Sequence, residues 1–186
     1  MTERKQTSKS RRRILNAFIE LRSQKELEKI TVVEICERAD INKSTFYVYF
    51  HDVYDLSRQM QQEIIDRIAA SLPDPDNVIK NTAQFTRDIL MAYEANKQQI
   101  QTMFSGSQSS RLPMLVKAKI LELIQQLHPE IEDSQRLRLI LNYKIYGAYY
   151  AFLEDTDMNE MEKIEYISNL AGESSFNASL NRVVVG

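Results

Sequence analysis

The sequence has 186 residues, of which 43% are hydrophobic and 27% are charged, with a formal net charge of −2. This is an ordinary globular composition, and the chain is long enough to bury a sizeable core. Four Gly and four Pro are too few for a strand-rich fold, so an all-α fold is expected. A single Cys, no apolar signal-peptide core and no run of 18 apolar residues exclude a disulfide scaffold and favour a cytoplasmic protein without a membrane span.

The charge is unevenly distributed along the chain. Residues 1–50 carry 11 Lys and Arg against 7 Asp and Glu, whereas the other 136 residues carry 13 against 19. A basic first quarter on an acidic body suits a protein that presents one end to nucleic acid. Basic N-termini also occur in proteins without that role, so the asymmetry is only supporting evidence.

The first helix is expected to begin near residue 10, with residues 1–8 disordered and Ser8 or Ser10 as its cap. Its apolar positions form a stripe that faces a core. Residues 11–13 are three consecutive arginines, and in the first turn they would oppose the helix dipole. A nearby phosphate would relieve this conflict, and a solvated arginine cluster is the equally weighted alternative.

The stretch TVVEICERADINKSTFYVYF, residues 31–50, is the most informative part of the chain. Thr31 and Glu34 have the spacing of a capping box and predict the start of one short helix. Asp40 suits a left-handed turn, and Asn42 then caps a second helix. That second helix has a Phe side and a Lys/Ser/Tyr side, so the pattern predicts a helix-turn-helix whose natural partner is the DNA major groove.

The rest of the chain is also expected to be helical. A helix of about 20 residues from Asp52 should end before Pro73 and Pro75. Further helices are expected at 78–93, 95–104, 115–127, 134–153 and 158–170, whereas the tail 174–186 shows no clear pattern.

The first 55 residues resemble the TetR family of bacterial transcriptional regulators. The resemblance rests on ILNAFIEL, ITVVEICERADINKSTFYVYF and HDVYDL. Within the family, the chain is most similar to the branch of dihydroxyacetone kinase operon regulators. It implies a helix-turn-helix DNA-binding domain at 1–55, with a long helix leading into a helical regulatory and dimerisation domain at 56–186. It also implies a homodimer on a palindromic double-stranded DNA operator, whose DNA binding a ligand in the second domain controls.

Two residues depart from the family pattern. Asp40 stands where a Gly is usual, which keeps the turn feasible but implies a different geometry. Val53 stands where family members often have a phosphate-contacting Lys, so that contact is either absent or made by His51.

Hydroxyl and charged side chains of this region can bind phosphates, which positions a protein without reading sequence. Base reading would fall to Lys43, Ser44 or Thr45, near the start of the second helix. For Tyr47 and Tyr49 the alternative is hydrophobic packing with a solvated hydroxyl. The predicted DNA-binding residues are Thr31, Asn42, Lys43, Ser44, Thr45, Tyr47, Tyr49 and His51.

The second domain carries two further predictions, each with core packing as its alternative. An apolar ligand pocket would be lined by Phe85, Met91, Tyr93, Met103, Phe104, Tyr146, Tyr149 and Tyr150. A dimer interface would use Gly147, Ala148, Tyr150, Ile164 and Ile167. A second functional hypothesis has no effector: a DNA-bound adaptor whose C-terminal domain docks a partner protein.

Catalytic and metal-binding patterns are missing from the sequence. There is no nucleophile elbow, phosphate loop or His/Asp/Ser constellation, so an enzyme and a cofactor are not expected. His51 and His128 have no partner at metal-ligand spacing, so a metal site is not expected either. Cys36 is expected to be a packed thiol rather than a redox sensor.

Overall fold

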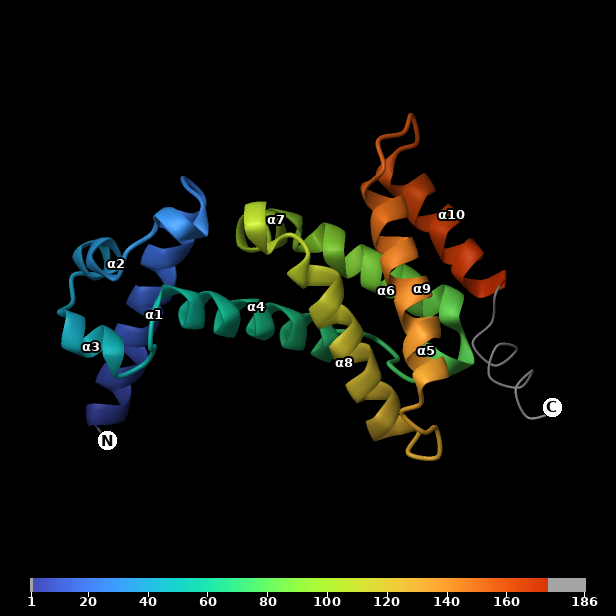
Figure 1. Cartoon of the computed structure of the whole chain (residues 1–186), viewed down its shortest axis with the longest axis horizontal. Helices are drawn as coiled ribbons and strands as arrows, with labels where there is room; N and C mark the ends of the chain where they lie inside the picture. Colours follow the sequence, from blue (N-terminus) through green and yellow to red (C-terminus); the bar gives the residue numbers. More distant parts are fainter. Residues whose placement is uncertain (1, 174–186) are drawn as a thin grey trace. The chain divides into compact units, whose positions relative to one another are not determined.

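The computed structural model describes residues 2–173, and the tail 174–186 lies outside this range. Within the described residues the secondary structure consists of helices only, so the all-α prediction is confirmed. None of these helices is long and apolar enough to cross a membrane. Figure 1 shows the helices in chain order.

The described chain divides into two compact units. Unit 1 comprises residues 2–64 and 98–110, and unit 2 comprises 65–97 and 111–173. The elements of unit 1 are α1 (Thr2–Arg22), η1 (Leu27–Lys29), α2 (Val32–Ala39), α3 (Lys43–Tyr47), most of α4 (Val53–Ala70) and α7 (Lys97–Met103), and η2 (Gly106–Gln108). Those of unit 2 are α5 (Asn77–Lys80), α6 (Thr82–Ala95), α8 (Arg111–Leu127), α9 (Gln135–Leu153) and α10 (Glu160–Glu173).

Unit 1 is built around side chains that its helices bury almost completely. Phe46 and Phe50, which the sequence pattern placed on an apolar side, are 0% and 1% exposed. They join Ile14, Phe18, Ile35 and Leu56, all fully buried. Burying a large apolar side chain contributes roughly 1.5–3 kcal/mol, so this core sets the relative positions of α1, α2 and α3.

The first helix starts earlier than the sequence suggested. α1 begins at Thr2, so residues 2–8 belong to it and neither Ser8 nor Ser10 is its cap. Residues 11–13 therefore lie in the middle of α1 rather than in its first turn. Because the dipole effect fades within one turn of a helix end, the predicted conflict between these arginines and the helix dipole does not exist.

Unit 2 has a main hydrophobic cluster formed by α5, α6, α8 and α9. Its buried members are Val78, Ile79, Phe85, Ile120, Ile124, Leu137 and Leu141. The single helix expected at 78–93 is broken at Asn81, which leaves the helical region with φ −147° and ψ 80°. The Asn81 side chain then caps α6 by accepting from the amide of Gln84 at 3.1 Å, because Asn favours caps over helix interiors.

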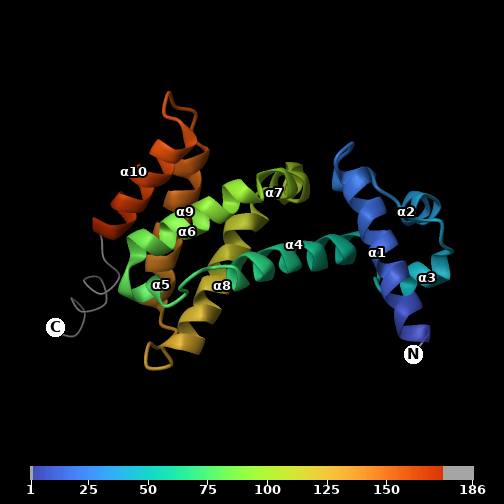
Figure 2. The same ribbon diagram turned by 180° about the vertical axis from the view of Figure 1, so that it is seen from behind.

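A second cluster joins α6, α9 and α10. Leu90, Phe152, Ile164 and Ile167 are buried there, and α9 and α10 run side by side in both views (Figures 1 and 2). Gly172 lets α10 approach α6 closely, since a Cβ built on it would stand 2.8 Å from the Cβ of Ala83.

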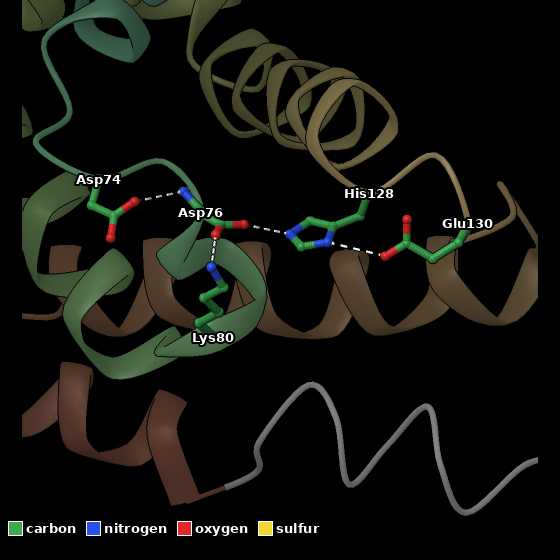
Figure 3. Close-up of polar contacts among 5 residues, drawn as sticks. All are labelled: Asp74, Asp76, Lys80, His128 and Glu130. Carbon is green, nitrogen blue, oxygen red and sulfur yellow. Dashed lines mark hydrogen bonds and ion pairs between the residues drawn. The ribbon is translucent and has the colours of Figure 1, made fainter.

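A polar cluster links the loops that precede α5 and follow α8 (Figure 3). Nε2 of His128 lies 2.6 Å from Oδ1 of Asp76, and its Nδ1 lies 3.2 Å from Oε1 of Glu130. Asp76 also pairs with Lys80, and the hydrogen bonds from Lys80 and His128 lower the pKa of Asp76. These bonds connect segments 52 residues apart in sequence.

The close approach at Gly172 gives a test of the packing between α6 and α10. We expect Gly172→Ala to lower the free energy of unfolding by about 1 kcal/mol, because overpacking costs about 1–3 kcal/mol and the helix propensity of Ala returns about 1 kcal/mol. Thermal unfolding measures this change. Adding Ala83→Gly should remove the clash, and a Gly172→Ala protein more stable than wild type would contradict the packing.

Candidate nucleic-acid interface

The predicted capping box starts α2. Oγ1 of Thr31 accepts from the amide of Glu34 at 3.3 Å, and Oε2 of Glu34 accepts from the amide of Thr31 at 3.0 Å. Lys25 forms an ion pair with the same Glu34 side chain. The hydrogen bonds from Lys25 and Thr31 lower the pKa of Glu34 to about 2, so this carboxylate keeps its charge at neutral pH and holds the end of α2.

The turn between α2 and α3 is a left-handed helix end at Asp40. Asp40 has φ 50° and ψ 56° and is the only non-glycine residue with a positive φ among those described. The amide of Ile41 donates to the carbonyl of Cys36 at 3.0 Å, and that of Asp40 donates to Glu37 at 3.2 Å. This pair of bonds is a Schellman motif, which satisfies the last carbonyls of α2.

Asn42 caps α3, as its position in the sequence predicted. Its Oδ1 accepts from the amide of Thr45 at 2.8 Å and from the hydroxyls of Ser44 and Thr45, both at 2.7 Å. Asn42, Ser44 and Thr45 therefore form one local network at the start of α3. Contacts from these two hydroxyls to DNA would require them to leave the cap or to accept rather than donate.

The exposed side of α3 is the part of unit 1 best suited to enter a groove. Lys43 and Ser44 are exposed, and Tyr47 keeps 56% of its surface accessible while its ring meets Phe46 edge-on at 5.5 Å. Val48, one turn after Ser44, is 72% exposed. Val48 is not among the residues predicted from the sequence, although an apolar residue on the polar side of the helix was the available signal. Such a side chain suits the methyl group of thymine.

Beyond α3 the chain turns into α4. α3 ends at Tyr47, and a turn carries the backbone to Phe50, whose amide still donates to the carbonyl of Phe46 at 3.1 Å. His51 is exposed and its amide donates to Asp55 at 3.0 Å. Val53 is 7% exposed, so it is a core residue of unit 1. Tyr49 is half-buried, with its ring 6.3 Å from that of Phe50.

The three consecutive arginines of α1 are in different environments. Arg11 pairs with Glu63 of α4 and lies 5.7 Å above the ring of Phe50. Nη2 of Arg13 lies 2.6 Å from Oδ2 of Asp40, and Arg12 is exposed. These long-range pairs were not visible in the sequence, because no local pattern specifies which acidic residue meets which arginine.

An open hollow of about 550 Å³ lies beside the turn. Residues of α1, α2, the turn and α3 line it, namely Ser10, Cys36, Glu37, Asp40, Ile41, Asn42 and Thr45. Cys36 itself is 4% exposed, and burial raises the pKa of its thiol. It is a packed residue, as predicted.

The residues predicted to line a ligand pocket fall in both units. Met103 and Phe104 are buried in unit 1, whereas Phe85, Met91, Tyr93, Tyr146, Tyr149 and Tyr150 belong to unit 2. Tyr93 packs edge-on against Phe152 at 5.5 Å, and Tyr149 against Tyr150 at 5.1 Å. Burial raises the pKa of both Tyr93 and Tyr149, whereas Met91 and Tyr150 are exposed.

The residues predicted for a dimer interface differ in exposure. Ile164 and Ile167 are 1% and 5% exposed and lie in the core of a single chain, with Ala148 packed against them. Tyr150 is exposed, and a Cβ built on Gly147 would meet nothing within 4 Å. Gly147 and Tyr150 are thus open to a partner, whereas Ile164 and Ile167 are not.

A metal-binding group of three His, Cys, Asp or Glu side chains is not found among residues 9–173, whose side chains the structure describes. The cluster at His128 also involves Lys80, which competes as a cation for Asp76.

No protein-family model and no curated protein matches the sequence. Among solved structures, the chain is similar to a TetR transcriptional regulator from Rhodococcus sp. RHA1, with 20% sequence identity and a TM-score of 0.46. The alignment covers 96% of this chain and 99% of that one. A similarity at this level does not assign the chain to a family.

Proposed function

We propose that this chain is a TetR-like DNA-binding transcriptional regulator that binds a palindromic operator as a homodimer. The observation that carries the proposal is the α2–turn–α3 segment, with a capping box at its start, a Schellman turn at Asp40 and a cap at Asn42. This segment holds a short helix in place. Phe46 is buried, and the exposed face of the helix carries Lys43, Ser44, Tyr47 and Val48. A helix held in this way is suited to the major groove.

Within this proposal the side chains divide by task. Lys43, next to the N-terminal end of α3, reads a base edge or binds a phosphate, and Val48 contacts an apolar base edge. Tyr47 and the exposed Arg12 bind backbone phosphates, together with Thr31, Tyr49 and His51, and so fix the register. In a two-fold dimer the two α3 helices would enter successive major grooves about 34–36 Å apart.

The exposed face of α9 supports the homodimer. Leu139, Tyr143 and Tyr150 are 67%, 79% and 57% exposed and recur at helical spacing, opposite the buried Leu137, Leu141 and Phe152. On the neighbouring α10, Tyr166 and Leu170 are 58% and 46% exposed. Exposed apolar and aromatic side chains that recur on one side of a helix favour an interaction surface, and a second copy would fit it by an isologous contact.

Ligand control would act through residues 98–110. Although the chain on both sides of this segment belongs to unit 2, the segment itself belongs to unit 1. Nε2 of the fully buried Gln61 donates to the carbonyl of Met103 at 3.0 Å, and Nη2 of Arg22 donates to Oγ of Ser105 at 2.8 Å. A ligand that moves α6 or α8 would displace this segment, which connects the two helices in sequence. By thermodynamic linkage, bound DNA would change the affinity for that ligand by the same factor.

The tyrosines of unit 2 indicate the kind of ligand this unit would bind. Tyr93, Tyr146 and Tyr149 suit a flat or apolar molecule that accepts one or two hydrogen bonds. Membership of the dihydroxyacetone kinase operon branch stays a prediction from the sequence.

The groove-facing residues provide the direct test of DNA binding. We expect Lys43→Ala combined with Tyr47→Ala to weaken binding to the DNA upstream of the protein's own gene by at least about 30-fold, because two lost contacts of about 1 kcal/mol or more each cost at least about 2 kcal/mol together. Gel shifts at 50 and 200 mM salt measure the affinity. Both side chains are exposed, so the melting temperature should stay close to that of wild type.

Lys29→Ala is the matched control for lost charge, because Lys29 is exposed on η1, outside α2 and α3. It should bind DNA nearly as well as wild type. If the double variant binds as tightly as wild type, α3 is not the reading helix.

The apolar face predicts the oligomeric state. We expect Tyr143→Glu to convert a dimer into a monomer, because a charge at the centre of an apolar interface is desolvated without a partner. Sedimentation velocity measures this, and Gln126→Glu, at an exposed position of α8, should leave the dimer intact. A wild-type monomer would instead indicate that a different protein covers this face.

A further inference from the structure

Arg13 is held beside the proposed DNA-reading helix by an acidic residue. Its Nη2 lies 2.6 Å from Oδ2 of Asp40, and the two side chains are 39% and 92% exposed. Arg11 is more firmly placed, since it pairs with Glu63 and also lies over the Phe50 ring. Among the side chains of residues 9–173, Arg13 therefore has one ion-pair partner, an almost fully exposed carboxylate.

Asp40 lies where this pair matters most for DNA. It ends α2 in the left-handed conformation and precedes the cap Asn42 by two residues. The N-terminal end of the second helix is the part that meets base edges in helix-turn-helix proteins. A carboxylate at this place repels phosphates and also keeps an arginine from them.

A phosphate can replace the carboxylate as the partner of Arg13. Both groups accept two parallel hydrogen bonds from a guanidinium. Exposed ion pairs contribute little to stability, so exchanging one acceptor for the other has a small cost. The exchange requires a phosphate held in a defined position, which a docked operator provides and loosely bound DNA does not.

We propose that Asp40 determines specificity by withholding Arg13 from DNA until a correctly docked operator places a phosphate beside it. This inference rests on the proposed function, since it assumes that unit 1 binds DNA through α3. On unrelated DNA the Arg13–Asp40 pair stays closed, and unit 1 makes one phosphate contact fewer than it makes on the operator. On the operator the pair opens, and Arg13 contributes to the salt dependence of binding.

The test compares salt dependences on two duplexes, the DNA upstream of the protein's own gene and an unrelated sequence. Each phosphate contact adds about 0.9 to the steepness of the fall of log affinity with log salt. Between 50 and 200 mM salt, one such contact lowers the DNA affinity by a further factor of about 3.5 for each copy of unit 1, or about 12 for the dimer. We expect Asp40→Asn to steepen the slope on unrelated DNA by this amount and to raise affinity at 50 mM salt. On the operator the slope should not change. Asn tolerates the left-handed backbone, so the turn should keep its geometry.

Two further variants separate the release of Arg13 from a simple loss of negative charge. Glu37 lines the same hollow and forms no ion pair with the side chains of residues 9–173, so Glu37→Gln removes the same charge without freeing any of these arginines. It should leave the slope on unrelated DNA unchanged. Arg13→Ala combined with Asp40→Asn should also lose the steeper slope.

The outcomes distinguish this inference from the proposed function. A slope that Asp40→Asn leaves unchanged, or that the double variant with Arg13→Ala steepens equally, would overturn the role of Asp40 while leaving DNA binding by α3 intact. Wild-type protein with no salt-dependent affinity for either duplex would overturn the proposed function itself. A melting temperature within about 2 °C of wild type, a shift of under 1 kcal/mol for a domain of this size, verifies that each variant is folded.

Discussion

The left-handed turn at Asp40 is the constraint on which the DNA-binding account depends. The two hydrogen bonds of the Schellman motif end α2, and two residues after Asp40 the side chain of Asn42 caps the start of α3. The polar groups at both helix ends are satisfied locally, so α3 can be as short as five residues and still hold one direction. Phe46 and Phe50 then anchor it in the core of unit 1. Exposure of Lys43, Tyr47 and Val48 follows from the burial of those two rings.

Local sequence signals predicted the parts of this site that local physics determines. A capping box needs residues three positions apart, and Thr31 with Glu34 forms it as expected. Asp40 and Asn42 adopt the predicted turn and cap, and the end of α4 at Ala70 precedes Pro73. Each of these features depends on fewer than six consecutive residues. The break at Asn81 is also local, but the long apolar pattern around it concealed the cap.

Features that depend on long-range contacts were not predictable in the same way. Nothing near Arg13 in the sequence indicates a partner 27 positions away, and nothing in residues 98–110 indicates that they pack in unit 1. The exposed side of α9 and the burial of Ile164 follow from how α6, α9 and α10 pack, since both helices α9 and α10 carry apolar residues on more than one side. For this reason the dimer interface predicted from the sequence included Ile164 and Ile167, which lie in the chain's own core.

Several basic side chains of unit 1 have an acidic partner within the same unit. Arg11, Arg13, Lys25 and Arg38 each pair with an Asp or Glu of the same unit. If unit 1 binds DNA as proposed, such pairing would make its binding to arbitrary DNA weak, because non-specific affinity arises almost entirely from phosphate neutralisation. Specific binding would then depend on contacts that form only in the correct register, which is the property a regulator of few sites would require.

Hydroxyl-radical footprinting of the full chain on the DNA upstream of its own gene tests the central claim most directly. Two α3 helices on a two-fold dimer should protect two patches on one face of the duplex, about 10–10.5 base pairs apart or a multiple of that spacing. The protection should be lost when Lys43 and Tyr47 are replaced by Ala. Protection of a continuous stretch with no preferred position, or none at all, would contradict the claim that α2 and α3 form a sequence-reading head.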